Sequence, residues 1–116
     1  MKRITSWTAI LAVLIAAPLA ALNPLSPTNL AQFQSDGTTP IAQGGNVTGG
    51  SVVLRATVNT TDAQAQLRIE VKLVAQAFTG VATQTSPLTN NGLNATLTFA
   101  GLAPGSYKWQ AWIFCT

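Results

Sequence analysis

The stretch GLAPGSYKWQAWI, residues 101–113, decides the fold of this chain. Its first five residues predict a tight turn, because Pro104 presets its own φ and Gly105 can adopt a positive φ. From Tyr107 onward the residues alternate between two faces with the period of a β-strand. One face carries Tyr107, Trp109, Ala111 and Ile113, and the other carries Lys108, Gln110 and Trp112. Large aromatic side chains on one face need a core opposite them, so the stretch predicts a central strand of an all-β domain.

The same stretch resembles the corner and penultimate strand of fibronectin type III and related immunoglobulin-like modules, in which a Leu-x-Pro-Gly turn leads into a Tyr that hydrogen-bonds to nearby backbone. Leu102, Pro104, Gly105 and Tyr107 carry the match, with the Tyr one residue nearer the Gly than in the usual animal version. The runs LAQFQSDGTTPIAQGG (30–45) and VVLRATV (52–58) are similar to the opening of secreted bacterial immunoglobulin-like modules. The resemblance implies a fold, a β-sandwich, and no particular activity.

Other segments show the same alternation and are predicted as further strands. The clearest is Gln66–Leu73, whose aliphatic residues at every second position are typical of a half-buried antiparallel strand. The predicted strands are Asn29–Phe33, Ser51–Asn59, Gln66–Leu73, a short one within Val81–Thr85, Leu93–Phe99 and Tyr107–Ile113. Their inward positions predict a core of Leu54, Val58, Leu67, Ile69, Val71, Leu97, Phe99, Tyr107 and Trp109.

The outward positions of Gln66–Leu73 carry Arg68, Glu70 and Lys72. Charges in this arrangement invite a ligand-binding interpretation. Interleaved charges of opposite sign more commonly mark a solvated face, and we therefore expect these three side chains to lie on the surface.

The composition argues against enzymatic and metal-binding functions. The chain of 116 residues has no His and a single Cys, Cys115, so it holds neither an intrachain disulfide nor a Cys/His metal cluster. Without His, the Ser-His-Asp and Cys-His arrangements of nucleophilic catalysis are impossible. The glycine cluster at 44–50 leads into a strand and not into a phosphate-binding helix. We expect no catalytic residues, no cofactor and no metal.

The net charge argues against a nucleic-acid partner. The formal net charge is +3, but Lys2 and Arg3 fall in the predicted leader described below. The remaining four cations and three anions leave a net charge of about +1, with no run of basic residues. The cations are Arg55, Arg68, Lys72 and Lys108, and the anions are Asp36, Asp62 and Glu70.

Residues 1–21 predict a secretory signal peptide. Lys2 and Arg3 form its positive start, residues 10–17 its apolar centre, and Pro18 ends its helix before a group of small residues. This pattern predicts export, either as a secreted protein or to the cell surface.

The best cleavage points follow Ala20 and Ala21. The alternative is an uncleaved membrane anchor, because residues 4–22 could nearly cross a bilayer of about 30 Å. Residues 22–27 then form a linker broken by two prolines, and residues 28–116 form one immunoglobulin-like domain.

An immunoglobulin-like sandwich has about seven strands, and its last strand pairs with the penultimate one. We find no segment after the Tyr107 strand to take that place. The strand is therefore expected to have an open edge at which another chain can pair. The candidate interaction residues at this edge are Lys108, Gln110, Trp112 and Phe114.

Together these observations predict a non-enzymatic, exported bacterial module that acts as a spacer or protein-interaction domain. Its partner would be a neighbouring domain or a second copy at the open edge. Three alternatives remain open: a carbohydrate-binding sandwich that uses an exposed Trp, a structural subunit completed by another chain's strand, and a truncated copy of a module from a larger surface protein.

Overall fold

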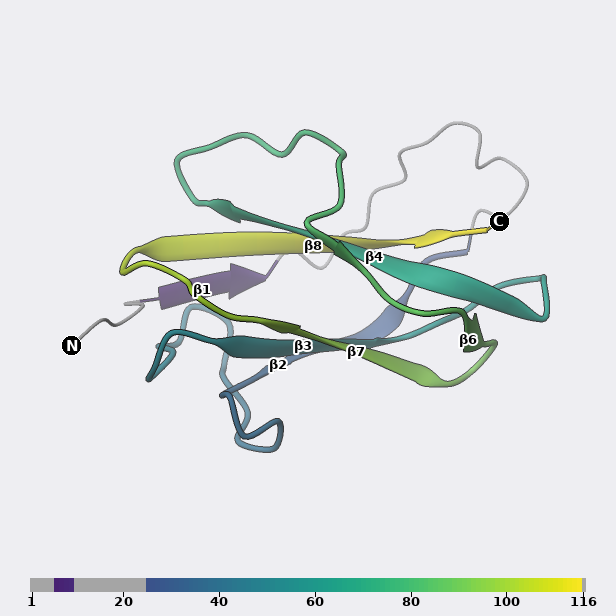
Figure 1. Cartoon of the computed structure of the whole chain (residues 1–116), viewed down its shortest axis with the longest axis horizontal. Helices are drawn as coiled ribbons and strands as arrows, with labels where there is room; N and C mark the ends of the chain where they lie inside the picture. The colour runs from purple at the N-terminus through teal and green to yellow at the C-terminus, as the bar shows by residue number, and fades with distance from the viewer. Residues whose placement is uncertain (1–5, 10–24, 116) are drawn as a thin grey trace.

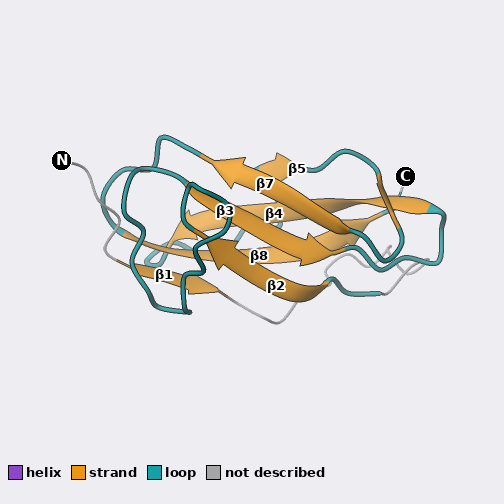
Figure 2. Cartoon of the chain, turned by 90° about the horizontal axis from the view of Figure 1, so that it is seen from below, coloured by secondary structure: helices purple, strands orange, loops and turns teal. Residues whose placement is uncertain are grey.

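The computed structural model describes residues 6–9 and 25–115, and these contain strands, turns and loops but no helix. The described strands form two sheets that face each other in a β-sandwich-like arrangement (Figures 1 and 2). The first sheet has the order β1 (Ser6–Ala9), β8 (Ser106–Phe114), β4 (Gln64–Leu73) and β5 (Gln84–Thr85), with β6 (Thr89–Asn90) also pairing with β4. The second sheet has the order β2 (Thr28–Phe33), β3 (Val52–Thr57) and β7 (Asn94–Phe99).

Long antiparallel pairs hold each sheet together. The β4 and β8 strands pair without interruption from Gln66 opposite Phe114 to Leu73 opposite Tyr107. The β3 and β7 strands pair from Val52 opposite Phe99 onward, again antiparallel. The aromatic-rich strand at the end of the chain is therefore central to its sheet, as the alternation in its sequence predicts.

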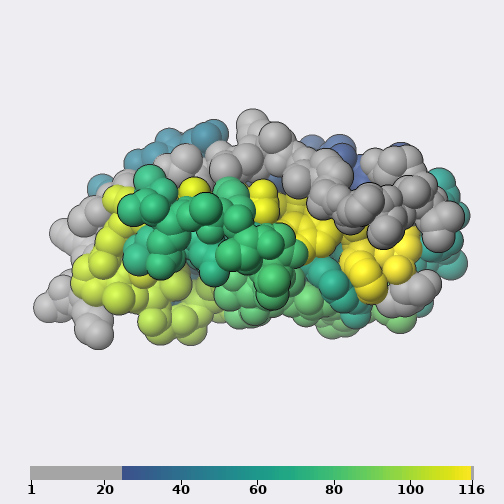
Figure 3. All heavy atoms as spheres, turned by 90° about the horizontal axis from the view of Figure 1, so that it is seen from above, coloured from purple at the N-terminus to yellow at the C-terminus, as the bar shows by residue number. Residues whose placement is uncertain are grey.

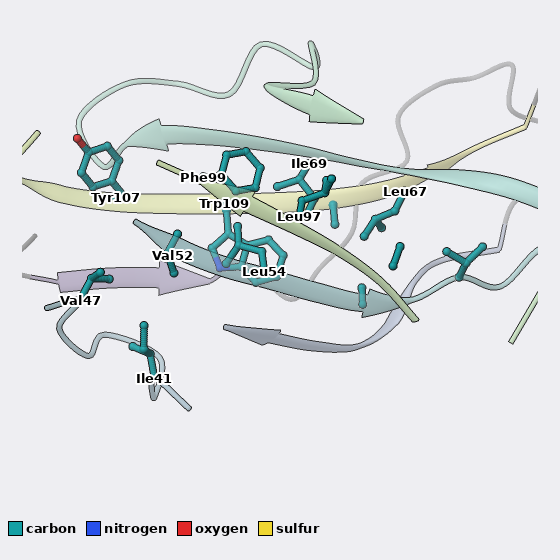
Figure 4. Close-up of a cluster of buried hydrophobic side chains, with 14 of the residues drawn as sticks. Ile41, Val47, Val52, Leu54, Leu67, Ile69, Leu97, Phe99, Tyr107 and Trp109 are labelled. Carbon is teal, nitrogen blue, oxygen red and sulfur yellow. The ribbon is translucent and has the colours of Figure 1, made fainter. Parts of the chain in front are cut away.

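The core lies between the two sheets and combines the inward side chains of β3, β4, β7 and β8 (Figure 4). The predicted core is confirmed, with Val71 only partly buried at its margin. The buried members of the predicted core are Leu54, Val58, Leu67, Ile69, Leu97, Phe99, Tyr107 and Trp109. Among the core residues absent from the predicted list, Ile41 and Val47 come from the loop between β2 and β3, which folds against the sandwich.

The side chain of Trp109 links the two sheets through a hydrogen bond. Its indole Nε1 donates a hydrogen bond of 2.8 Å to the side-chain oxygen of Gln32, and the Gln32 amide donates one of 3.0 Å to the backbone oxygen of Ala42. Both side chains are buried, so these bonds meet the requirement that buried polar groups be paired. These two hydrogen bonds connect β8 to β2, and β2 to the loop that follows it.

The turn before β8 has the corner hydrogen bond that its sequence suggests. The Tyr107 hydroxyl donates to the backbone oxygen of Ala103 at 2.8 Å. Gly101 and Gly105 both have positive φ, of 71° and 158°, which L side chains rarely adopt, so the positive φ expected of Gly105 is present. The shorter Gly-to-Tyr spacing therefore still allows the tyrosine to reach back to the turn.

We expect Tyr107→Phe to lower the free energy of unfolding by about 1 kcal/mol, the usual net contribution of one hydrogen bond. The ring would remain in the core, and the bond to Ala103 would be lost. Urea denaturation of both forms measures the difference. A change below about 0.3 kcal/mol would mean that water replaces the bond at no cost.

Two expectations about strands and helices are wrong, and one strand was not expected. Ser6–Ala9 was expected to be part of a signal-peptide helix, but these residues form β1, paired with β8. The expected strand within Val81–Thr85 is reduced to β5, and the short β6 was not predicted at all. Strands of two residues carry too little alternation to be recognised, and their pairing depends on the neighbouring β4.

The remaining part of the predicted leader, including the cleavage points after Ala20 and Ala21, lies outside the described residues. Within the described residues, we find no helix that is long and apolar enough to span a membrane.

Candidate interaction surface

The predicted interaction residues lie on the face of the first sheet that points away from the core. We call this the outer face, formed by alternate residues of β4 and β8. Register pairs place Lys108 opposite Lys72, Gln110 opposite Glu70, Trp112 opposite Arg68 and Phe114 opposite Gln66. Figure 3 shows this face, with the green atoms of the β4–β5 connection over one part of it and the yellow atoms of β8 beside them.

Glu70 is the residue for which the surface prediction is wrong. Its side chain is completely buried, because the connection between β4 and β5 folds back over the outer face. One carboxylate oxygen accepts hydrogen bonds from the backbone N–H and the hydroxyl of Thr79, at 2.7 and 2.8 Å. The other accepts from the backbone N–H of Gly80 at 2.9 Å and from the Gln110 amide at 3.1 Å. Glu70 thus anchors this connection to the sheet.

The protonation of Glu70 follows from these contacts. Burial acts to raise the pKa of the carboxyl, but the donors from Thr79, Gly80 and Gln110 stabilise the charged form and leave the pKa below its usual value. Lys72 adds an ammonium group at 4.0 Å. Glu70 is therefore an ionised structural anchor and not a proton donor for chemistry at neutral pH.

Cation–aromatic contacts flank Glu70 on the outer face. The guanidinium carbon of Arg68 lies 3.5 Å from the centre of the Phe114 ring, and the Lys108 ammonium lies 4.7 Å from the centre of the Phe78 ring. The Nε atom of Arg68 is buried without a hydrogen-bond partner. Trp112 is partly buried between these positions. Arg and aromatic side chains in this proximity are the residue types enriched at protein interfaces.

The backbone edge of β8 differs from the fully open edge that the sequence predicts. β1 runs parallel to β8 and pairs from Ser6 opposite Ser106 to Ala9 opposite Trp109. Among the described strands, none continues this pairing along Gln110–Phe114. The prediction of an open edge is thus wrong for the first half of β8, because a segment from the far end of the chain covers it. Because the sequence of that segment resembles a signal peptide, it was not predicted to form a strand.

A groove of about 400 Å³ lies at the other end of the sandwich, near the tyrosine corner. Its walls come from the end of β4, from β5 and from the connection between β7 and β8. The lining mixes Lys72, Gln76 and Gln84 with apolar Leu73, Leu102 and Tyr107. None of the predicted interaction residues lines it.

The structure brings together no constellation typical of catalysis within residues 6–9 and 25–115. Asp36 is held in its own turn by Thr38 and Thr39, which lower the pKa of its carboxyl to about 2, with Thr39 the main cause. Glu70 is enclosed as described, and Asp62 lies in the turn before β4. In this part of the chain, no group of three or more His, Cys, Asp or Glu side chains could hold a metal ion.

Cys115 lies directly after β8, with its sulfur 3.6 Å from the Thr60 hydroxyl. Its side chain is partly buried against the margin of the core. This position connects the end of β8 to the turn before β4.

Comparison of the chain with protein-family models, with curated proteins and with solved structures finds no significant match. The candidate surface must therefore be interpreted from its own geometry.

Proposed function

We propose that this chain is a non-enzymatic, exported immunoglobulin-like module that serves as a spacer or protein-interaction domain. The observation that carries the proposal is the incomplete edge of β8: no described strand pairs with the outer backbone groups along Gln110–Phe114, which lie next to the side chains of Trp112 and Phe114. Such an edge is a known means of binding an extended segment of another protein.

The order of strands supports an immunoglobulin-like sandwich. The sheet β2-β3-β7 has the order of strands A, B and E of that fold, and β4-β8 has the order of strands C and F. The position beside β8 would belong to the last strand, G, which is antiparallel to F. Here it is partly occupied by the parallel β1. The tyrosine corner agrees with the same assignment, since its hydroxyl bonds to backbone a few residues upstream.

Export and cleavage are tested on the chain's N-terminus. We expect the exported protein to begin at Ala21 or Leu22, because cleavage is predicted after Ala20 or Ala21. N-terminal sequencing of protein from the culture medium and from the cell surface identifies the first residue. Replacing both Lys2 and Arg3 by Glu should reduce export, whereas replacing Lys2 by Arg should not. Recovery of intact Met1 in the membrane fraction would support the anchor instead.

The interaction itself is tested by proteins retained on the immobilised exported chain. We expect a protein ligand whose retention is lost when Trp112 and Phe114 are both replaced by Ala, since both lie beside the incomplete edge. Retention on polysaccharide that depends on Trp112 would support the carbohydrate-binding alternative. A chain that retains neither would be a spacer only.

A further inference from the structure

The pairing of β1 with β8 is short, and the described strands cover only about half of this edge. It comprises four register pairs and stops at Ala9 opposite Trp109 (Figure 1). β8 continues to Phe114, while its other side remains paired with β4 over that whole length. With nine residues against four, β8 is thus more than twice as long as the strand that occupies its edge.

The inward side chains of β8 show where cover is missing. Trp109 and Ala111 are fully buried, whereas Ile113 and then Cys115 are only partly buried although they face the same core. The last pair with β1 is at Trp109, Ala111 is still fully buried beyond it, and the loss of burial begins at Ile113. A strand added along this half would cover apolar surface as well as pair backbone groups, and both contributions favour its binding.

β1 also belongs to the segment that is predicted to be removed. Ser6–Ala9 lies within residues 1–21, so cleavage after Ala20 or Ala21 would take β1 away and open the edge of β8 from Ser106 to Phe114. This step rests on the proposed function, which includes export with cleavage.

We propose that β1 is a placeholder and that the edge of β8 is an acceptor for a parallel strand donated by another polypeptide. The donor would be an extended segment of about nine residues. It would carry small or apolar side chains opposite Ala111 and Ile113, because residues paired in a parallel register point to the same side of the sheet. Backbone hydrogen bonds would supply affinity, and these alternate side chains would supply specificity.

The direction of β1 argues for a different polypeptide and against a second copy. The seated strand is parallel to β8. Two copies that paired their β8 edges about a two-fold axis perpendicular to the sheet would run antiparallel. A second copy that had lost its leader would also lack the Ser6–Ala9 segment itself.

The experiment uses the full chain and a peptide that copies residues 6–14, SWTAILAVL, which in the register of β1 lies opposite residues 106–114, with two lysines added at its end for solubility. Trp7→Pro and Thr8→Pro are made separately to weaken β1. The N–H groups of neighbouring residues in a strand point to opposite sides, so one of the two prolines removes a group that faces β8. Thr8→Val is the matched control, because it keeps the N–H and favours strand structure. A peptide of the same composition in scrambled order is the control ligand.

Fluorescence anisotropy measures peptide affinity, and hydrogen exchange locates the peptide. We expect at least one proline variant to bind the peptide ~10-fold more tightly than Thr8→Val does, because the resident strand no longer competes. Those amides of Gln110–Phe114 that point away from β4 should exchange ~10-fold more slowly with the peptide bound, in the proline variant and to a smaller extent in the unaltered chain.

Equal binding of the scrambled peptide, or unchanged exchange along Gln110–Phe114, would overturn the acceptor edge. Dimerisation of the proline variants without peptide, seen by light scattering, would make a second copy the occupant and would also overturn it. The export experiment is independent. Specific peptide binding together with an uncleaved leader would retain the acceptor edge and reject the proposed processing.

Discussion

Trp109→Ala should lower the free energy of unfolding by about 3–5 kcal/mol, as expected for removal of a fully buried aromatic side chain from a core. Trp109 has no exposed surface, and its ring extends from β8 into the core beside Leu54 of β3 (Figure 4). The substitution would also leave the buried oxygen of Gln32 without its donor. For a domain of this size the loss is a large part of the total stability. Urea denaturation followed by circular dichroism measures it.

Trp112→Ala is the matched control, since it removes the same side chain from the outer face of the same strand. Trp112 is only partly buried, and we expect a loss of about 1 kcal/mol. Trp109→Phe separates the two contributions, because it keeps an aromatic ring but removes the indole N–H. Equal losses for the two alanine variants would mean that the faces of β8 are assigned wrongly.

Glu70→Ala should be the second most damaging change, with a loss of about 2–4 kcal/mol. The carboxylate accepts hydrogen bonds from Thr79, Gly80 and Gln110, and its removal would leave these donors unpaired beneath the β4–β5 connection. Glu70→Gln is informative because its amide has a similar shape but keeps only one acceptor oxygen. Arg68→Ala is a control from the same face of β4. Hydrogen exchange in the variants should rise first at Thr79 and Gly80.

The contribution of Glu70 to the stability of the folded protein should decrease as the pH falls. Its pKa is lower in the folded protein than in the unfolded chain, so the unfolded chain binds more protons between the two values. The stabilisation is therefore fully present above the ordinary carboxyl pKa of 4.5 and is lost as pH falls through the folded-state pKa. The stability difference between the unaltered protein and Glu70→Gln, measured at several pH values, should shrink on acidification below 4.5. A difference that grows in acid would contradict the anchored carboxylate.

Local alternation was sufficient to predict the main strands and the faces of β3, β4, β7 and β8. A strand that buries one face against a core needs apolar residues at every second position, and these residues are adjacent in sequence. The core around Leu54, Leu67 and Trp109 could be named for this reason. The turn before β8 was predictable because Gly and Pro have their own backbone preferences.

The alternation gave a wrong prediction for Glu70, a charged residue that the β4–β5 connection covers. Glu70 occupies an outward position, and its sequence neighbours Arg68 and Lys72 suggested a solvated face. Its burial depends on Thr79 and Gly80, which reach it only because the β4–β5 connection folds back over the sheet. The sequence around Glu70 contains no trace of that fold-back.

The sequence by itself determined an all-β chain, its principal strands and their core-facing residues, because these follow from side-chain period and turn chemistry over a few residues. Only the tertiary structure decided the long-range pairings. It paired Trp109 with Gln32, buried Glu70 and placed Ser6–Ala9 along β8. Each of these joins residues of different strands or loops through backbone or polar atoms. Almost every residue can offer such atoms, so no local pattern distinguishes the ones that pair.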